Sequence, residues 1–109
     1  MTVPFVSIIV LNYNGLRFLD DCLGSLAQLD YPSGRYEVVL VDNVSQDGSA
    51  DVAQNRFPWV RIVRNSHNLG FAAGNNVAIR GTSADYVVLL NNDTSVDRQW
   101  LSRLVDAAE

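Results

Sequence analysis

Two amides and a carboxylate follow directly on an apolar run near the end of the sequence. Residues 87–90 are all Val or Leu, and Asn91, Asn92 and Asp93 come next. A carboxylate in this setting can hold a divalent cation while phosphate oxygens and water complete the octahedron, the usual way in which Mg²⁺ is bound. Asn-Asp-Thr-Ser is also an ordinary turn and helix-capping composition, so these residues alone leave a structural role open.

The same order, an apolar run and then polar side chains, occurs twice earlier in the chain. Residues 6–11 lead into Asn12 and Tyr13, and residues 36–41 lead into Asp42 and Asn43. A tyrosine ring could stack on a nucleobase, and a carboxylate could accept a hydrogen bond from a pyrimidine N–H or a ribose hydroxyl. A core tyrosine and a plain turn are the alternatives. Together with a cation ligand, these residues are the parts of a nucleoside-diphosphate site.

Four short apolar runs predict the strands that position these residues. They lie at residues 6–11, 36–41, 60–63 and 86–90, and runs of Val, Ile and Leu without polar alternation are typical of strands buried on both faces of a parallel sheet. The run at 60–63 is shorter and is interrupted by Arg61. That interruption predicts a strand at the edge of the sheet.

Helices are predicted between the strands. Leucines recur at spacings of three and four over residues 16–29, which defines one face of a helix. Ser49 is a candidate cap for a short helix that ends at Arg56, and residues 72–80 form another helical segment. Asp97 is a candidate cap for the last helix.

The alternation of strands and helices predicts an α/β chain. Its connections are short, so right-handed crossovers give a Rossmann-like parallel sheet with helices on both faces and strand order 3-2-1-4. Ligands of such sheets bind beyond the carboxyl ends of the strands, where the order reverses. We therefore expect Asn12 and Tyr13 to face Asn91, Asn92 and Asp93.

Composition excludes several classes of function. At 109 residues, with 48% apolar and 18% charged residues, residues 1–109 are expected to form one globular domain. All eight basic residues are Arg, and without Lys the chain cannot be a P-loop NTPase or a Schiff-base enzyme. There is no basic patch for nucleic acid. His67 is the only histidine, which argues against a zinc site, and Cys22 fits a buried apolar helix face.

Apolar runs of only a few residues predict no transmembrane segment. The first residues lack the basic and apolar regions of a signal peptide, so we expect a cytoplasmic chain.

Four segments of the chain, in order, resemble the family 2 glycosyltransferases, which have the GT-A fold. Residues 7–15 (SIIVLNYNG) are similar to the opening strand and base-stacking loop of that family, and residues 41–49 (VDNVSQDGS) to the signature after its second strand. Residues 68–76 (NLGFAAGNN) are similar to the segment that borders the nucleotide, and residues 90–94 (LNNDT) stand in place of the DXD metal motif. The resemblance covers nearly the whole chain and implies the N-terminal half of a GT-A fold.

The resemblance implies nucleotide-binding roles for five residues of this chain. A ring would stack on the base, a carboxylate would hydrogen-bond it, and the other residues would lie beside the nucleotide, with Asn92 near the ribose. The five residues are Tyr13, Asp42, Asn43, Gly70 and Asn92.

For the metal, the resemblance implies that Asp93 ligates Mg²⁺ or Mn²⁺ against the donor diphosphate. Asn91 stands at the first carboxylate position of the motif, so the protein supplies less negative charge, and we expect weak metal binding without nucleotide. The Asn-Asn-Asp-Thr form is most similar to the rhamnosyltransferase-like branch. That likeness predicts a dTDP-sugar or UDP-sugar donor.

The activity implied is an inverting, metal-assisted transfer of a sugar from a nucleotide donor. Members of the family continue past the helix at Trp100, and the later part carries the acceptor site and the general base. We therefore expect a truncated enzyme: this chain holds the donor nucleotide and metal, has no catalytic residue of its own, does not bind the saccharide acceptor, and is inactive in isolation.

Two other functions are weighed against this one. The first is a non-catalytic α/β module that pairs with a second copy through an exposed sheet edge or helix face. The second is a nucleotidyltransferase-like enzyme, which usually opens with a Gly-rich loop and a basic residue. Residues 12–15 offer neither feature.

Overall fold

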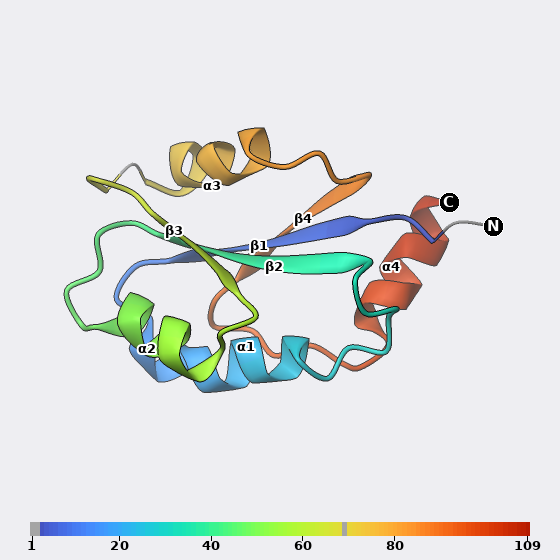
Figure 1. The fold of residues 1–109 in the computed structure, drawn as a ribbon, viewed down its shortest axis with the longest axis horizontal. Coiled ribbons are helices and arrows are strands. Elements are labelled where there is room, and N and C mark those ends of the chain that lie inside the picture. The colour runs from blue at the N-terminus through green and yellow to red at the C-terminus, as the bar shows by residue number, and fades with distance from the viewer. Residues whose placement is uncertain (1–2, 69) are drawn as a thin grey trace.

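The computed structural model describes residues 3–68 and 70–109, without the side chains of Phe71, Ala72 and Val77 (Figure 1). Strands and helices alternate along the chain, as the apolar spacing predicts. The elements are β1 (Val6–Asn12), the 3-10 turn η1 (Leu16–Phe18), α1 (Leu19–Leu26), β2 (Tyr36–Asp42), α2 (Ser49–Arg56), β3 (Arg61–Arg64), α3 (Gly70–Arg80), β4 (Tyr86–Asn91) and α4 (Trp100–Ala108).

The four strands form one parallel sheet in the order β3-β2-β1-β4, which confirms the predicted order and the predicted edge position of β3. The register brings the carboxyl ends of the strands level with one another. Asn12 at the end of β1 pairs with Asp42 at the end of β2, and Leu11 pairs with Asn91 at the end of β4. The polar residues that follow each strand therefore emerge at one edge of the sheet.

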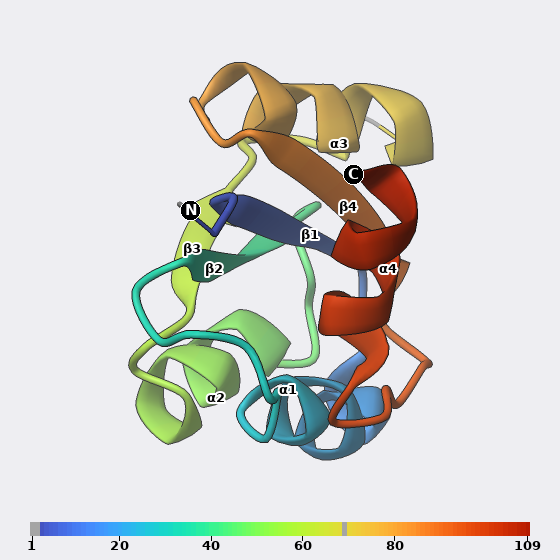
Figure 2. The ribbon, with the colours of Figure 1, turned by 90° about the vertical axis from the view of Figure 1, so that its right-hand side faces the viewer.

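Side chains alternate between the two faces of the sheet, and different helices cover each face. On one face Ile8 and Val10 of β1 belong to a buried cluster with residues of α1, α2 and α4. On the other face Ile9 and Val39 pack with Ala78 of α3. Figure 2 shows α3 above the sheet and α1 and α2 below it. The prediction of helices on both faces is confirmed.

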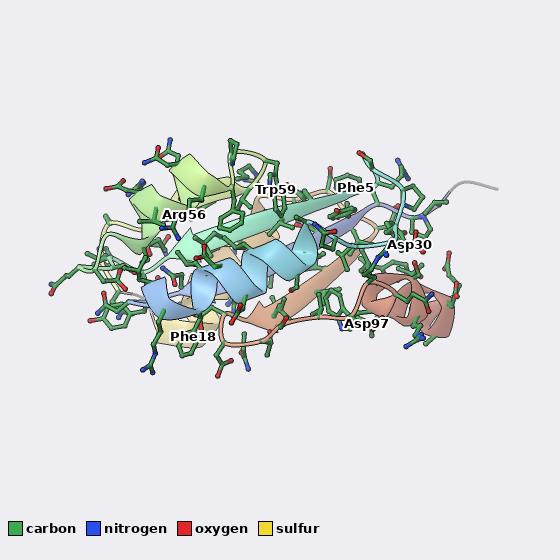
Figure 3. The ribbon with its side chains drawn as sticks, turned by 90° about the horizontal axis from the view of Figure 1, so that it is seen from below. Phe5, Phe18, Asp30, Arg56, Trp59 and Asp97 are labelled. Carbon is green, nitrogen blue, oxygen red and sulfur yellow. The ribbon has the colours of Figure 1, made fainter. Side chains whose placement is uncertain are left out.

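Helix α1 shows how the leucine spacing produces the core. Leu19, Leu23 and Leu26 lie on one side of the helix and are fully or almost fully buried, each contributing about 2 kcal/mol of hydrophobic stabilisation. Figure 3 shows α1 lying across the sheet between α2 and α4. Cys22 is on the same buried side, and burial, with a smaller effect of Asp93, raises the pKa of its thiol to about 11. The thiol therefore serves as a core residue, as its position in the helix pattern predicts.

The prediction that the fourth strand is buried on both faces is wrong. None of the six residues of β4 is buried, and Val87 and Leu89 are 37% and 46% exposed. β4 lies at the edge of the sheet, as the predicted order requires, and Leu89 pairs with Ile9 on the face where α3 packs. Among the described side chains, the cluster around Ala78 of α3 includes neither Val87 nor Leu89, so the helix leaves that face of β4 open. An unbroken apolar run identifies a strand correctly, but its burial depends on what lies beside it.

Two helix caps also differ from the predicted ones. Ser49 is the first residue of α2 and not its cap; Gly48 precedes the helix, and the Ser49 N–H donates to Asp47 Oδ1 at 2.9 Å. Helix α4 begins at Trp100 after Gln99, while Asp97 Oδ1 accepts from the Gln99 N–H. In both places an aspartate two residues upstream fixes the backbone as it enters the helix.

Over residues 3–68 and 70–109, no helix combines the length and the apolar character needed to cross a membrane.

Candidate functional site

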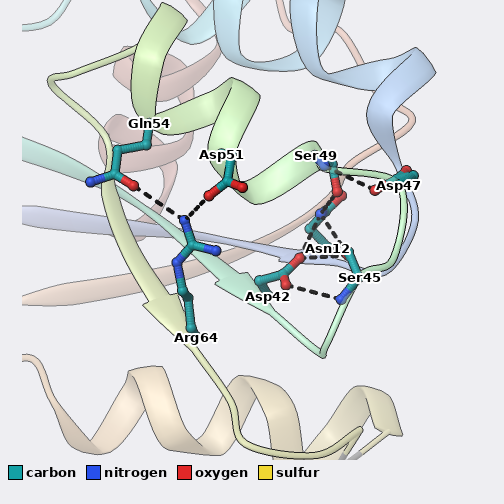
Figure 4. A network of polar contacts seen from close by, with 8 residues as sticks. All are labelled: Asn12, Asp42, Ser45, Asp47, Ser49, Asp51, Gln54 and Arg64. Carbon is teal, nitrogen blue, oxygen red and sulfur yellow. Dashed lines mark hydrogen bonds and ion pairs between the residues drawn. The ribbon is translucent and has the colours of Figure 1, made fainter.

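Three loops meet at the carboxyl edge of the sheet. They follow β1, β2 and β4, and hydrogen bonds between residues far apart in sequence join them. Asn12 Nδ2 donates to Asp42 Oδ1 at 2.9 Å and to Ser49 Oγ at 2.8 Å, and Ser45 Oγ lies 3.2 Å away (Figure 4). On its other side, Asn12 Oδ1 accepts from Asn92 Nδ2 at 3.1 Å. The predicted meeting of Asn12 with the residues after the fourth strand is confirmed.

Asp42 supports the loop that follows it. Asp42 is only 4% exposed. Besides the bond from Asn12, Oδ1 accepts from Ser45 Oγ at 2.6 Å, and Oδ2 accepts from the Ser45 N–H at 3.0 Å. The structure thus directs both oxygens at the protein, and the hydrogen bond to a base remains a prediction.

Asn43 connects the end of β2 to the start of α3. The side chain is 2% exposed, its Nδ2 donates to the Gly70 carbonyl at 3.1 Å, and its Oδ1 accepts from Asn65 Nδ2 at 2.6 Å. Gly74 faces the same amide: a Cβ added there would lie 2.9 Å from Asn43 Nδ2 and 2.8 Å from Leu11 Cδ1. A glycine at position 74 therefore allows α3 to approach the strand ends closely.

Tyr13 presents its ring to solvent and is 52% exposed. The loop around it is held by Asn14, whose N–H donates to Ser45 Oγ at 2.9 Å and whose Oδ1 accepts from the Gln46 N–H at 2.7 Å. Asn14 has a φ of 51°, a left-handed value that Asn tolerates better than most residues. The backbone that carries the ring is therefore fixed while the ring itself is free to stack.

Asp47 joins the first two loops from the other side. Its Oδ2 accepts from the Leu16 N–H at 3.0 Å. Burial raises the pKa of Asp47, but hydrogen bonds from Ser49 and from the backbone outweigh it and hold the pKa below its ordinary value. The stability that Asp47 provides is thus present above its unfolded pKa and is lost as the pH falls through the lower folded value.

Val44 adopts a conformation that is unfavourable for a β-branched residue. Its φ is 60°, and its side chain is 38% exposed at the turn between Asn43 and Ser45. A left-handed backbone costs a non-glycine residue about 1–3 kcal/mol, and such strain clusters at ligand-binding loops. The bonds that Asp42 makes to Ser45 hold the turn in this conformation.

The loop after β4 is a tight turn with the carboxylate at its tip. The Asn91 carbonyl accepts from the Thr94 N–H at 3.2 Å and from Thr94 Oγ1 at 2.6 Å. Asn91 and Asp93 are exposed, while Asn92 reaches back to Asn12. The turn composition seen in the sequence thus has a structural role, and the same turn presents Asp93 to solvent.

The side-chain oxygens in this turn fit a cation that is also bound by a second molecule. Within the part of the chain that the structure describes, no group of three or more His, Cys, Asp or Glu side chains could hold a metal alone. One exposed carboxylate, two residues after an exposed amide, matches the way Mg²⁺ is held by one or two carboxylates together with phosphate oxygens and water. Asp93 and Asn91 therefore fit such an ion only in company with a phosphate ligand.

Three residues of the site were missed by the reasoning from sequence. Ser45 and Ser49 accept from Asn12, and Gly15 lies against the Asn12–Asn92 pair. The spacing of Ser45 three residues after Asp42 is a turn signal that could have revealed it. Ser49 and Gly15 carry no such local signal, because Ser49 contacts a residue 37 positions away and Gly15 lies against a bond to the loop after β4.

Known proteins share this chain's sequence and fold. The family model described as "Glycosyl transferase family 2" matches residues 7–109. Glycosyltransferase AglE of Haloferax volcanii is 34% identical over 105 residues, which is 94% of this chain and 34% of AglE. The poly(ribitol-phosphate) beta-N-acetylglucosaminyltransferase TarS of Staphylococcus aureus is 28% identical over 98 residues, or 87% of this chain and 17% of TarS. The chain thus spans about a third or less of the length of these relatives.

Solved structures of glycosyltransferases have the same fold as this chain. The mannosyltransferase PcManGT from Pyrobaculum calidifontis, in complex with GDP-Man and Mn²⁺, superimposes with a TM-score of 0.84 and 28% identity over 96% of this chain and 31% of its own. TarS of S. aureus in complex with UDP gives 0.83 and 27% over 95% of this chain and 31% of its own. These neighbours are GT-A glycosyltransferases, which confirms the predicted fold. The chain belongs to glycosyltransferase family 2.

Proposed function

We propose that this chain binds the nucleoside-diphosphate sugar donor of a glycosyltransferase, together with a divalent cation, at the carboxyl edge of its sheet. The observation that carries the proposal is the convergence of the three strand ends, with Asn12 bonded to both Asp42 and Asn92. The GDP-Man and Mn²⁺ bound to PcManGT, and the UDP bound to TarS, support it, since both proteins have this fold.

The base would lie on the exposed ring of Tyr13. Asp42 and Asn43, at the end of β2, are assigned to the base side of the nucleotide, and Gly70 borders it at the start of α3. Both residues at the end of β2 are nearly buried, so they would shape and orient the loop. We also assign to them the polar atoms that the loop offers to the base. Asn92 would lie near the ribose.

The cation, Mg²⁺ or Mn²⁺, would be held by Asp93 with Asn91 and the donor diphosphate. When bound, it supplies positive charge to the leaving diphosphate. In an inverting transfer, an acceptor hydroxyl oxygen bonds to the anomeric carbon while the bond from that carbon to the diphosphate oxygen breaks. The residues of this chain would hold and orient the leaving group, and we assign the acceptor site and its general base to another part of the enzyme.

The likeness of residues 91–94 to the rhamnosyltransferase-like branch supports a dTDP-sugar, with a UDP-sugar as the other donor. We also propose a cytoplasmic location for the chain.

Calorimetric titration with UDP, dTDP and GDP, with and without Mn²⁺, tests the assignment. Tyr13→Ala is expected to weaken binding of the preferred nucleotide by about 1–3 kcal/mol, or roughly 5- to 150-fold, because base stacking is lost. Tyr13→Phe keeps the ring and should bind nearly as well. Asp93→Asn should abolish the gain in affinity that Mn²⁺ provides, whereas Asp97→Asn, four residues further along, should leave it unchanged.

Three results would count against the proposal. The first is an absence of binding for all three diphosphates, and the second is equal loss in Tyr13→Phe and Tyr13→Ala. The third is tight Mn²⁺ binding by the free protein, which would contradict a cation site completed by the nucleotide.

One observation favours a second function, association with another copy of the chain. Val87 and Leu89 of β4 and Leu104 of α4 are 37–46% exposed and border an apolar groove of about 350 Å³. Open apolar strand edges favour pairing with another chain. Sedimentation at high concentration separates the two functions, since a strict monomer would contradict association.

A further inference from the structure

Asn12 is the one side chain bonded to both the loop after β2 and the loop after β4 among the residues that the structure describes. It is fully buried, at 0% exposure. Nδ2 faces Asp42 and Ser49, and Oδ1 faces Asn92. The base side and the cation side of the proposed site are therefore joined through one carboxamide.

The orientation of this carboxamide is determined by its neighbours. A carboxylate only accepts hydrogen bonds, so the atom of Asn12 that lies 2.9 Å from Asp42 Oδ1 must be the N–H₂ group. The oxygen then points toward Asn92 Nδ2, which donates to it at 3.1 Å. A rotated amide would place oxygen against oxygen at Asp42, so the Asp42 carboxylate fixes the orientation of Asn12.

Gly15 encloses this hydrogen bond. A Cβ added to Gly15 would lie 2.1 Å from Asn92 Nδ2 and 2.4 Å from Asn12 Oδ1, closer than any Cβ contact allows. The Asn12 side chain cannot move away from the added atom, because it is buried and hydrogen-bonded to Asp42 and Ser49. A side chain at position 15 therefore forces Asn92 and the loop that carries position 15 to shift, which disturbs the hydrogen bond between Asn92 and Asn12.

We propose that Asn12 is a positioning residue: through Asn92 it fixes the turn that carries Asp93 relative to the loop after β2, so that nucleotide binding and cation binding are coupled. This inference rests on the proposed function, since it names the group that holds the two halves of that site in register. Asn12 itself needs no contact with the ligand, and the geometry of the bond sets where Asp93 stands.

Gly15→Ala tests the coupling without removing any polar group. The probes are UDP, dTDP and GDP, each titrated with and without Mn²⁺, and the control is Gly24→Ala, since a Cβ at Gly24 meets nothing within 4 Å. For the tightest of the three diphosphates, the readout is the Mn²⁺-dependent gain, which is the ratio of the affinities with and without Mn²⁺. Gly15→Ala should reduce this ratio at least about fivefold, the lower end of typical site-to-site coupling.

Asn92→Ala is the second variant, in case the added methyl group prevents folding. It removes the donor and leaves Asn12 bonded to Asp42 and Ser49. The Mn²⁺-dependent gain should fall by at least about fivefold in this variant too, as the same coupling is lost. Backbone amide NMR of the ligand-free proteins should show shifts at residues 91–94 in Gly15→Ala, where the turn keeps its own sequence, and none there in Gly24→Ala.

A Mn²⁺-dependent gain that survives in both variants overturns the positioning role, as does a Gly15→Ala spectrum in which residues 91–94 do not respond. If the unchanged protein binds none of the three diphosphates, the proposed function fails, and the ligand-free spectra still decide whether Asn12 and Asn92 hold the turn that carries Asp93.

Discussion

Replacing Asp42 by alanine is expected to lower the free energy of unfolding by about 3 kcal/mol, because buried and partly buried hydrogen-bonding groups would lose their acceptor. The groups are the buried Asn12 Nδ2 and the partly buried N–H and hydroxyl of Ser45, and Asp42 itself is 4% exposed. A domain of this size has a total stability of only about 5–15 kcal/mol, so the loss should be plain in urea unfolding.

Asp20→Ala is the matched control. Asp20 also has a partner, Arg56 Nη1 at 2.8 Å, but its side chain is 65% exposed. Exposed ion pairs contribute about 0–1 kcal/mol, so this variant should unfold close to the unchanged protein. Equal losses in the two variants would show that Asp42 does not support its loop in the way that its contacts indicate.

Gly74→Ala and Gly24→Ala are expected to change stability in opposite directions. At Gly74 the new methyl group would press on Leu11 and on Asn43, whose amide is fixed by Gly70 and Asn65. Overpacking of this kind costs about 2 kcal/mol even in a helix, where alanine is otherwise preferred. At Gly24 the space is open, and the gain in helix propensity should stabilise by up to about 1 kcal/mol.

Urea unfolding of the two glycine variants should therefore differ by about 3 kcal/mol. If both variants were stabilised, the space around Gly74 would accommodate a methyl group, and the inference that α3 approaches the strand ends closely would be wrong.

The fold was largely predictable because its signals are local. Apolar runs locate the four strands, leucine spacing locates α1, and short right-handed crossovers leave few strand orders to consider. The predicted order already places β4 at an edge of the sheet, but a run of Val and Leu does not reveal how much of each face of that strand the helices will cover. Local sequence determines the type of an element, and its environment comes from the rest of the chain.

The site was predictable in its location but less so in the roles of its residues. The polar residues after three strands do converge, as the topology requires. Asp42 is buried, and Asn12 bonds to Asp42 and to Ser49, which are 30 and 37 positions further along the chain. No local pattern encodes contacts between residues so far apart. The left-handed turn at Val44 was likewise hidden, because glycine or asparagine would signal such a turn and valine does not.

The central claim is that the three strand ends form a nucleoside-diphosphate site. Backbone amide NMR, recorded during titration with UDP, dTDP and GDP in the presence of Mg²⁺, tests it most directly. The expected result is a set of shifts confined to residues 12–16, 42–49, 70 and 91–94, with Mn²⁺ in place of Mg²⁺ broadening residues 91–94 most strongly. A hollow of about 300 Å³ lies near the start of β2, bordered by Tyr36, Glu37 and Trp59. Shifts centred there, or no shifts with any of the three nucleotides, would contradict the account.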